Sequence, residues 1–231
     1  MKTVRLLELI NYTWQGESVD SGKKMLLLRF KRCNRAHGYL EKNGLTACSF
    51  CDTIVKMQVM QEANYNIKDI QLMIDENNLG CLISGGEPGF GFNLQSTIDI
   101  VNLTKSYLYN IETNGCNLEK MIEGINKNKN VTYVLSPKLF TDEDFSFYKN
   151  LIENIKDNDK VIIKLVTENR PEIHQFLDFL KETKFNTNRI WLMPQGKSKD
   201  ELIKNAPFVF DMCEKYSANF SSRDHVIYDF I

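Results

Sequence analysis

The sequence predicts an α/β fold, an incomplete βα barrel of TIM type with parallel strands, and three observations support this. Short aliphatic and β-branched runs alternate with longer amphipathic segments beyond residue 60, which is typical of βα units around a parallel sheet. The short runs are nearly continuous in apolar character, as strands covered on both faces are. Polar or glycine-containing turns follow several runs, at the strand ends where such folds bind ligands. An open, doubly wound sheet is the alternative.

Strands are expected where the aliphatic runs occur, and helices where apolar residues recur at helical spacing. The expected strands are residues 2–10, 24–30, 80–84, 106–112, 131–136, 160–166 and 189–194. The expected helices are residues 66–78, 93–104, 117–128, 142–155, 170–183 and 198–216. In residues 170–183, Ile173, Phe176 and Leu180 share one helical face. Pro171 falls near the first turn, where its missing N–H costs little.

Composition and charge limit the class of protein. The chain has 231 residues, 42% of them hydrophobic and 26% charged, which suits one well-buried core, so residues 1–231 are expected to form one domain. Lys and Arg number 29 and Asp and Glu number 30, so no net basic field attracts nucleic acid, and a small polar substrate is favoured. The N-terminus does not resemble a signal peptide, and no apolar run is long enough for a membrane helix. A cytoplasmic protein is therefore expected.

Three of the six cysteines, Cys33, Cys48 and Cys51, lie in one loop after an expected strand. In a reducing cytoplasm, clustered thiols are more often metal ligands or catalytic groups than disulfides. The other cysteines are dispersed along the chain and are expected to be buried as small apolar residues. They are Cys81, Cys116 and Cys213.

Three thiolates suit a metal centre that keeps one coordination position open. Closed zinc sites bind four ligands, commonly as two C-x-x-C pairs, whereas this loop has one such pair and a distant Cys33. An iron–sulfur cluster with one iron open to a substrate or cofactor is therefore favoured. A zinc site with His37 as the fourth ligand stays open as an alternative.

The turns at the strand ends carry the remaining unusual residues. They are SGGEP at 84–88, ETNG at 112–115, SPK at 136–138 and PQG at 194–196. Each alone is an ordinary turn composition, but successive units of a βα fold place such turns at one face. Together with the three thiols, they predict a ligand site there.

The chain has clustered cysteines after an early strand and a GGEP turn after a later one. In this pattern it resembles the radical S-adenosylmethionine enzymes. Most of that superfamily spaces its cysteines three and two residues apart, whereas fourteen residues separate Cys33 from Cys48. The 7-carboxy-7-deazaguanine synthases of queuosine and 7-deazapurine biosynthesis carry such an insert. Further motifs resemble that family, and they span most of the chain. These are WQGES at 14–18, FCDT at 50–53, MPQG at 193–196 and His225.

The resemblance implies a lyase that converts 6-carboxy-5,6,7,8-tetrahydropterin to 7-carboxy-7-deazaguanine, with ring contraction and loss of ammonia. It implies three cofactors, which are a 4Fe-4S cluster, S-adenosyl-L-methionine and Mg²⁺. The radical is carried by the cofactor, so no side chain is assigned as catalytic. A flavodoxin or ferredoxin electron donor and a homodimer accompany the resemblance as hypotheses, with no membrane and no direct nucleic-acid partner.

By resemblance, Cys33, Cys48 and Cys51 hold the cluster in a loop of residues 33–51. Backbone carbonyls at Gly86 can approach the methionine ammonium because no Cβ intervenes, and Glu87 can support that turn. The cofactor-binding residues implied are Phe50, Cys51, Asp52, Gly86, Glu87, Ser136, Pro137, Lys138, Met193, Pro194, Gln195 and Gly196.

The pterin edge requires paired donors and acceptors, which Gln15 and Glu17 offer, and its carboxylate suits the guanidinium of Arg29. Thr53 is implied as a Mg²⁺ ligand, and because one hydroxyl binds Mg²⁺ poorly, little of the ion is expected without substrate. The substrate-binding residues implied are Trp14, Gln15, Gly16, Glu17, Arg29, Ser84, Glu112, His225 and Ile231. Ser84 stands where the family usually has Thr and keeps a hydroxyl. Residues 217–231 are expected to close the pocket, with the terminal carboxylate of Ile231 reaching the pterin.

Two other functions remain open at this point. A radical S-adenosylmethionine activase, which places a glycyl radical on a partner enzyme, would use the same cluster and GGEP turn but would not need Arg29 or Thr53. A non-enzymatic zinc-binding or interaction module would use the thiols alone. Iron and sulfide content separates the zinc module from both enzymes.

Overall fold

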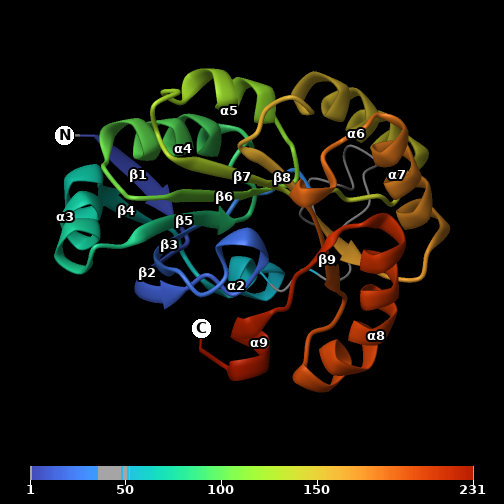
Figure 1. Ribbon diagram of the computed structural model, residues 1–231. Helices are drawn as coiled ribbons and strands as arrows, with labels where there is room; N and C mark the ends of the chain where they lie inside the picture. The colour runs from blue at the N-terminus through green and yellow to red at the C-terminus, as the bar shows by residue number, and fades with distance from the viewer. Residues whose placement is uncertain (1, 36–47, 49–50, 52, 231) are drawn as a thin grey trace. The chain divides into compact units, whose positions relative to one another are not determined.

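The structure is a computed structural model that describes residues 2–35, 48, 51 and 53–230 (Figure 1). Within it the chain forms two compact units, each built from two segments. The first unit consists of Met1–Gln15 and Gly22–Tyr133, and the second of Gly16–Ser21 and Val134–Ile231. The expectation of one domain stays a prediction. No described helix combines the length and the apolar character needed to cross a membrane.

The first unit is an α/β unit with a mixed sheet. Its strands are β1 (Thr3–Leu6), β2 (Glu8–Trp14), β3 (Lys24–Phe30), β4 (Ala63–Asn66), β5 (Gly80–Gly85), β6 (Tyr109–Thr113) and the start of β7 (Val131–Leu135). Its helices are α2 (Ile54–Val59), α3 (Ile67–Asn77), α4 (Phe92–Leu103) and α5 (Leu118–Gly124). Strands β3, β5 and β6 run parallel in that order, and β2 adds antiparallel to β3. Strands β1 and β4 form a separate antiparallel pair.

The register of the parallel strands brings the predicted loops to one sheet end. Arg29 of β3 lies opposite Ser84 of β5, and Phe30 lies opposite Gly85. The cysteine loop leaves β3 at Phe30, and the GGEP turn leaves β5 at Gly85. Because both strands point the same way, the two loops begin side by side.

The second unit is also α/β. Its elements are the 3-10 helix η1 (Ser18–Asp20), the end of β7, α6 (Asp142–Ile155), β8 (Val161–Thr167), α7 (Pro171–Glu182), the 3-10 helix η2 (Thr187–Arg189), β9 (Ile190–Pro194), α8 (Lys199–Tyr216), β10 (Asn219–Phe220) and α9 (Asp224–Tyr228). Strands β8, β9 and β10 are parallel neighbours in that order. Helix α7 begins at Pro171 and buries Ile173, Phe176, Leu177 and Leu180, the face expected from the sequence.

The sequence predicts the long elements well and the short ones poorly. The strand 24–30 and the helix 142–155 have the predicted bounds. Residues 2–10 were expected to form one strand, but the structure has two, because β1 pairs with β4 and β2 pairs with β3. Elements α2, β4, β10 and α9 were not predicted, since each has six residues or fewer and little periodicity.

Two further predicted elements differ from the structure by three residues or more at one end. Strand β6 begins at Tyr109 instead of residue 106, because the hydroxyl of Ser106 lies 2.8 Å from the carbonyl oxygens of both Leu79 and Leu108, where it can donate to either, and the chain turns there. Helix α5 ends at Gly124, several residues before the predicted end of its segment. Glycine is a poor helix former, which accounts for the early end.

Candidate active site

The GGEP turn of the first unit is bound to the start of the cysteine loop. The amide of Gly86 donates to the carbonyl of Phe30 at 2.6 Å, and the amide of Glu87 donates to that of Arg32 at 2.8 Å. A Cβ at position 86 would collide with the Arg32 carbonyl. Gly85 has a φ of +103°, a conformation that residues with a Cβ rarely adopt. Two glycines are therefore required where β5 meets this loop.

Glu87 connects the turn to the end of β6. Its side chain is buried, with 1% of the residue exposed. One carboxylate oxygen accepts from the Thr113 hydroxyl at 2.5 Å and the Gly89 amide at 2.8 Å, and the other accepts from the Asn114 amide at 2.6 Å. These bonds fix the turn against the ETNG segment and compensate for the burial of the carboxylate.

The three loop cysteines are half-buried, and none of the six cysteines of the chain, all of which are described, forms a disulfide. Burial is the main cause that raises the pKa of the Cys33 thiol to about 12; the charges of Glu87, Cys48 and Cys51 act in the same direction, and the hydrogen bond from the Arg35 amide acts against them. Of the dispersed cysteines, Cys81 and Cys213 are buried and Cys116 is half-buried.

The described residues contain no group of three or more His, Cys, Asp or Glu that could hold a single metal ion. Three free, half-buried thiols from one loop match the donor chemistry of an iron–sulfur cluster, in which each thiolate binds a separate iron. Four sequence-predicted residues, His37, Phe50, Asp52 and Ile231, lie outside the described residues, so the zinc alternative with His37 stays a hypothesis.

Arg29 and Thr53 lie together beside an acidic residue. The Arg29 guanidinium donates to the Glu8 carboxylate at 2.7 Å and to the Thr53 hydroxyl at 3.4 Å. Lys56 donates to the same carboxylate at 3.0 Å. Burial would raise the pKa of Glu8, but its hydrogen bonds and charge interactions with Lys56 and Arg29 lower it. Arg29 is therefore not an exposed surface arginine, since 14% of its side chain is accessible.

Two more predicted substrate residues meet in the first unit. Gln15, only 4% exposed, directs its amide nitrogen to Glu112 at 3.2 Å and to Asn110 at 3.3 Å. Ser84 is half-buried opposite Arg29. Trp14 is exposed and packs edge-on against Tyr12.

Glu17 is the centre of a charged cluster in the second unit. Its carboxylate lies 2.5 Å from the ammonium of Lys164, 3.0 Å from the guanidinium of Arg223 and 3.7 Å from the imidazole of His225. Burial would raise the pKa of Glu17, but the charges of Lys164, Arg223 and His225 together lower it to about 2. The group is therefore a carboxylate throughout the neutral range.

The segment before and within α9 packs against Gly16–Ser21. The amide of Asp224 donates to the Gly16 carbonyl at 2.8 Å, and Ser21 donates to the Asp224 carboxylate at 2.6 Å. The amide of Ser18 donates to the Ser221 hydroxyl at 2.8 Å. A Cβ at position 16 would stand 2.6 Å from the His225 ring, so glycine is needed for this close approach.

The other predicted cofactor residues of the second unit follow β7 and β9. Met193 and Pro194 are buried at the end of β9. The Gln195 carbonyl accepts from Asn205 at 2.7 Å, and the Gly196 carbonyl accepts from Arg223 at 2.8 Å. After β7, Pro137 is buried, and Lys138 donates to the Ser136 hydroxyl at 3.1 Å.

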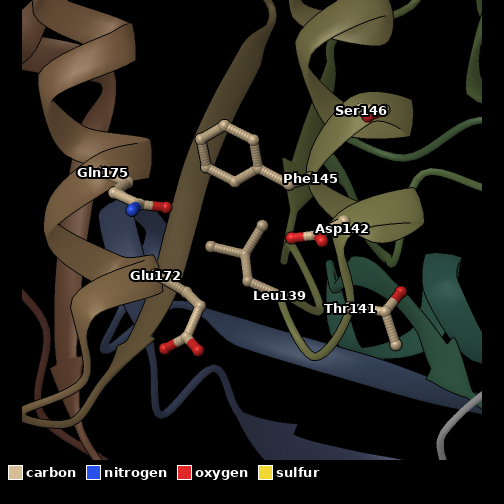
Figure 2. A pocket seen from close by; sticks show the side chains of 7 residues that line it. All are labelled: Leu139, Thr141, Asp142, Phe145, Ser146, Glu172 and Gln175. Atoms are coloured by element: carbon tan, nitrogen blue, oxygen red, sulfur yellow. The ribbon is translucent and has the colours of Figure 1, made fainter.

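A small cavity lies between α6 and α7 and is separate from these groups (Figure 2). Its lining residues are Leu139, Thr141, Asp142, Phe145, Ser146, Glu172 and Gln175. Its volume is about 150 Å³, below the range of roughly 300 to 1,000 Å³ that is usual for small-molecule sites. None of these residues is predicted for the site, so the cavity does not contribute to it.

Sequence reasoning missed three charged residues that contact predicted ones. They are Glu8, Lys164 and Arg223. Lys164 gave a signal, because a lysine in the middle of the apolar run 160–166 is unusual in a strand covered on both faces. Glu8 interrupts an apolar run in the same way, whereas nothing in the local sequence marks Arg223.

No protein-family model and no curated protein matches the chain. Solved structures do. Similarity to the crystal structure of QueE from Escherichia coli covers 96% of this chain and 95% of that one, with a TM-score of 0.58 and 15% identity. Similarity to Streptococcus suis SuiB, bound to the precursor peptide SuiA, covers 72% of this chain but only 45% of that one, with a TM-score of 0.51 and 19% identity. The chain therefore shares its fold with QueE, and the α/β fold class predicted from the sequence, an incomplete βα barrel, is confirmed.

Proposed function

We propose that this protein is a radical S-adenosylmethionine enzyme that converts 6-carboxy-5,6,7,8-tetrahydropterin to 7-carboxy-7-deazaguanine. The observation that carries the proposal is the fold shared with QueE, a 7-carboxy-7-deazaguanine synthase, over nearly the full length of both chains. At 15% identity this similarity supports the fold alone. The assignment of the reaction therefore rests on the sequence motifs that resemble those of the synthases. Their characteristic feature is the fourteen-residue spacing between Cys33 and Cys48.

In this proposal Cys33, Cys48 and Cys51 bind the 4Fe-4S cluster. With S-adenosylmethionine bound, that centre supplies the radical chemistry that protein side chains cannot perform. The chain itself holds the GGEP turn against the start of the cysteine loop through the amides of Gly86 and Glu87, and the buried Glu87 carboxylate holds that turn against the ETNG segment. The raised pKa of Cys33 means that its proton must leave when iron binds, since only the thiolate is a ligand.

The first unit supplies groups suited to the substrate's acid end. Arg29 is oriented by Glu8, which holds its guanidinium within reach of Thr53. A substrate carboxylate at this position would meet a fixed cation and a hydroxyl. The cation of Arg29 beside Thr53 opposes Mg²⁺ until an anion is present, so we propose that Mg²⁺ binds together with the substrate carboxylate.

The pterin ring has a different requirement, namely hydrogen bonds along its pyrimidine edge. Within the first unit, Gln15 and Glu112 form one hydrogen-bonded pair of such groups, and within the second unit Glu17 and His225 form another. The proposed role of these side chains is to orient the ring and exclude water.

The test is an assay of anaerobically purified and reconstituted protein. Iron and sulfide analysis with an optical spectrum establishes the cluster first. The protein is then incubated with 6-carboxy-5,6,7,8-tetrahydropterin, S-adenosylmethionine, Mg²⁺ and a reductant, and we expect 7-carboxy-7-deazaguanine to appear in product analysis by mass spectrometry.

An intact cluster that cleaves S-adenosylmethionine but yields no deazaguanine would refute the proposed reaction and leave the glycyl-radical activase as the better explanation. A colourless protein loaded with zinc would refute radical chemistry altogether. Omission of Mg²⁺ from an active assay shows whether that ion takes part.

A further inference from the structure

Glu17 is a carboxylate whose two oxygens are bound by cations from different elements of the second unit. Lys164 of β8 contacts one oxygen at 2.5 Å, and the Nε of Arg223 contacts the other at 3.0 Å. Only 5% of the Lys164 side chain and 12% of the Arg223 side chain are exposed. Both contacts are therefore shielded from solvent. Opposite charges attract each other more strongly in such a shielded place than in water.

We propose that Lys164 and Arg223 are positioning residues that fix Glu17 as a carboxylate acceptor, so that the ligand group bound there must present N–H donors. The inference deepens the proposed function and rests on it in one respect, because the 2-amino and ring N–H groups of a pterin are donors of this kind.

The protonation state of Glu17 decides which ligand groups it can bind. An ionised carboxylate only accepts hydrogen bonds, whereas a protonated carboxyl also donates one. A buried carboxyl without cations would take up a proton and could then bind a carbonyl edge. Each carboxylate oxygen has two lone pairs, so an oxygen bound to Lys164 or Arg223 can still accept from a ligand.

Arg223 also connects Glu17 to the turn after β9. Its Nη1 donates to the carbonyl of Gly196 at 2.8 Å, and its Nη2 lies 3.5 Å from the imidazole of His225. One side chain thus contacts two residues predicted to bind substrate and one predicted to bind cofactor. Its guanidinium has five N–H donors in a rigid fork, which suits it to several acceptors at once.

The first test removes the buried cation. Lys164→Met keeps the length of the side chain but not its charge, and Lys164→Arg keeps the charge. Binding of 6-carboxypterin to the anaerobic, cluster- and S-adenosylmethionine-loaded protein is measured by calorimetry. We expect Lys164→Met to weaken binding about tenfold to a hundredfold, because a buried charged partner is lost, and Lys164→Arg to restore much of it. Lys181→Met, at an exposed position of α7, is the matched control and should bind like the unaltered protein.

The pH dependence separates a positioning role from simple loss of packing. The titratable groups that the structure places against Glu17 are Lys164, Arg223 and His225. In the unaltered protein the pKa of Glu17 is about 2. Glu17 therefore stays ionised near neutrality, and its protonation does not change the binding affinity between about pH 5.5 and 8. In Lys164→Met, burial raises that pKa, and affinity should fall as pH decreases from about 8 to 5.5. A loss of affinity that is equal at every pH would overturn the inference.

A double-mutant cycle tests whether Lys164 acts through Glu17. If it does, Glu17→Gln combined with Lys164→Met weakens binding no more than Glu17→Gln alone. If the losses of the two single variants add up in the double variant, Lys164 acts elsewhere and the inference fails. Arg223→Gln in the same cycle should behave like Lys164→Met.

Stability distinguishes failure of this inference from failure of the proposed function. The folded-state pKa of Glu17 is about 2, below its ordinary value of 4.5, so the stability it contributes is present above pH 4.5 and is lost as pH falls from 4.5 towards 2. In Lys164→Met the sign reverses: with a folded-state pKa above 4.5, the protonated carboxyl contributes stability below pH 4.5, and that contribution is lost as pH rises through the folded-state pKa. This shift in pH dependence is followed by urea unfolding from about pH 3 to 8. A protein that binds no pterin but shows this shift would refute the proposed substrate and keep the role of Lys164 in fixing Glu17. If the unaltered protein binds the pterin but Lys164→Met changes neither the pH dependence of stability nor that of binding, the proposed substrate is kept and the role of Lys164 in fixing Glu17 is refuted.

Discussion

At the scale of single residues, side chains far apart in the sequence act as pairs. The sequence alone indicates that Arg29 and Glu17 have the right chemistry for a substrate, because residue type and motif are visible in it. It does not indicate that Glu8 holds Arg29 or that Lys164 holds Glu17, since those contacts form only when strands pair. Partners of this kind are beyond sequence reasoning because local patterns carry no information on distant neighbours.

The cysteines give a direct test at this scale. Replacing Cys33, Cys48 or Cys51 with Ser should remove most of the iron and the visible absorption, because the cluster depends on all three thiolates. Cys213→Ser is the matched control, since Cys213 lies buried in α8 and should not affect the cluster. Iron content and the optical spectrum after anaerobic reconstitution are the measurements. Full iron content in the Cys33→Ser protein would show that this residue is not a ligand.

Magnesium binding gives a second residue-level test. Arg29 donates to the Thr53 hydroxyl, so a divalent cation there meets a positive charge until a carboxylate arrives. We expect calorimetry on the cluster- and S-adenosylmethionine-loaded protein to detect Mg²⁺ binding with 6-carboxypterin and little without it. Thr53→Val should weaken the binding of Mg²⁺. Thr113→Val removes a hydroxyl that is bonded to Glu87 and not to Arg29, so this control should leave the affinity for Mg²⁺ unchanged. Tight Mg²⁺ binding without the pterin would contradict this expectation.

At the scale of elements, continuous apolar runs were the most reliable signal. Strand β3 has the predicted bounds because both of its faces are covered, so its sequence reads as one apolar run. The division of residues 2–10 into two strands depends on β4, whose sequence ANYN has no strand pattern of its own. The bounds of such edge elements come from pairing and not from propensity.

The turn after β5 carries the element-level prediction. Gly86→Ala would place a methyl group against the Arg32 carbonyl, a backbone atom that cannot move aside as a flexible side chain can. We expect a loss of about 3 kcal/mol in the free energy of unfolding by urea, and lower iron retention as the cysteine loop shifts. In Gly22→Ala the new Cβ meets nothing within 4 Å, so that control loses only the strain of its positive φ, about 1 kcal/mol. Equal losses in the two variants would show that position 86 has room for a side chain.

At the scale of the whole molecule, the fold class was visible in the sequence although no family model matches it. Alternation of apolar runs and amphipathic segments depends on the architecture and survives extensive substitution, so it remains readable where identity to QueE is 15%. The division into two units was not predicted, because a six-residue insertion such as Gly16–Ser21 leaves no compositional signal.

That short segment has a consequence for how the chain acquires its structure. The Glu17 carboxylate and its Arg223 partner are 206 positions apart, and the Ser18 amide is 203 positions from the hydroxyl that receives it. During synthesis the early segment emerges long before these partners exist, and closing so long a loop is slow. The second unit can therefore be completed only after residue 223 has been synthesised, and a nascent chain that stops before Arg223 leaves the Glu17 carboxylate without its guanidinium partner.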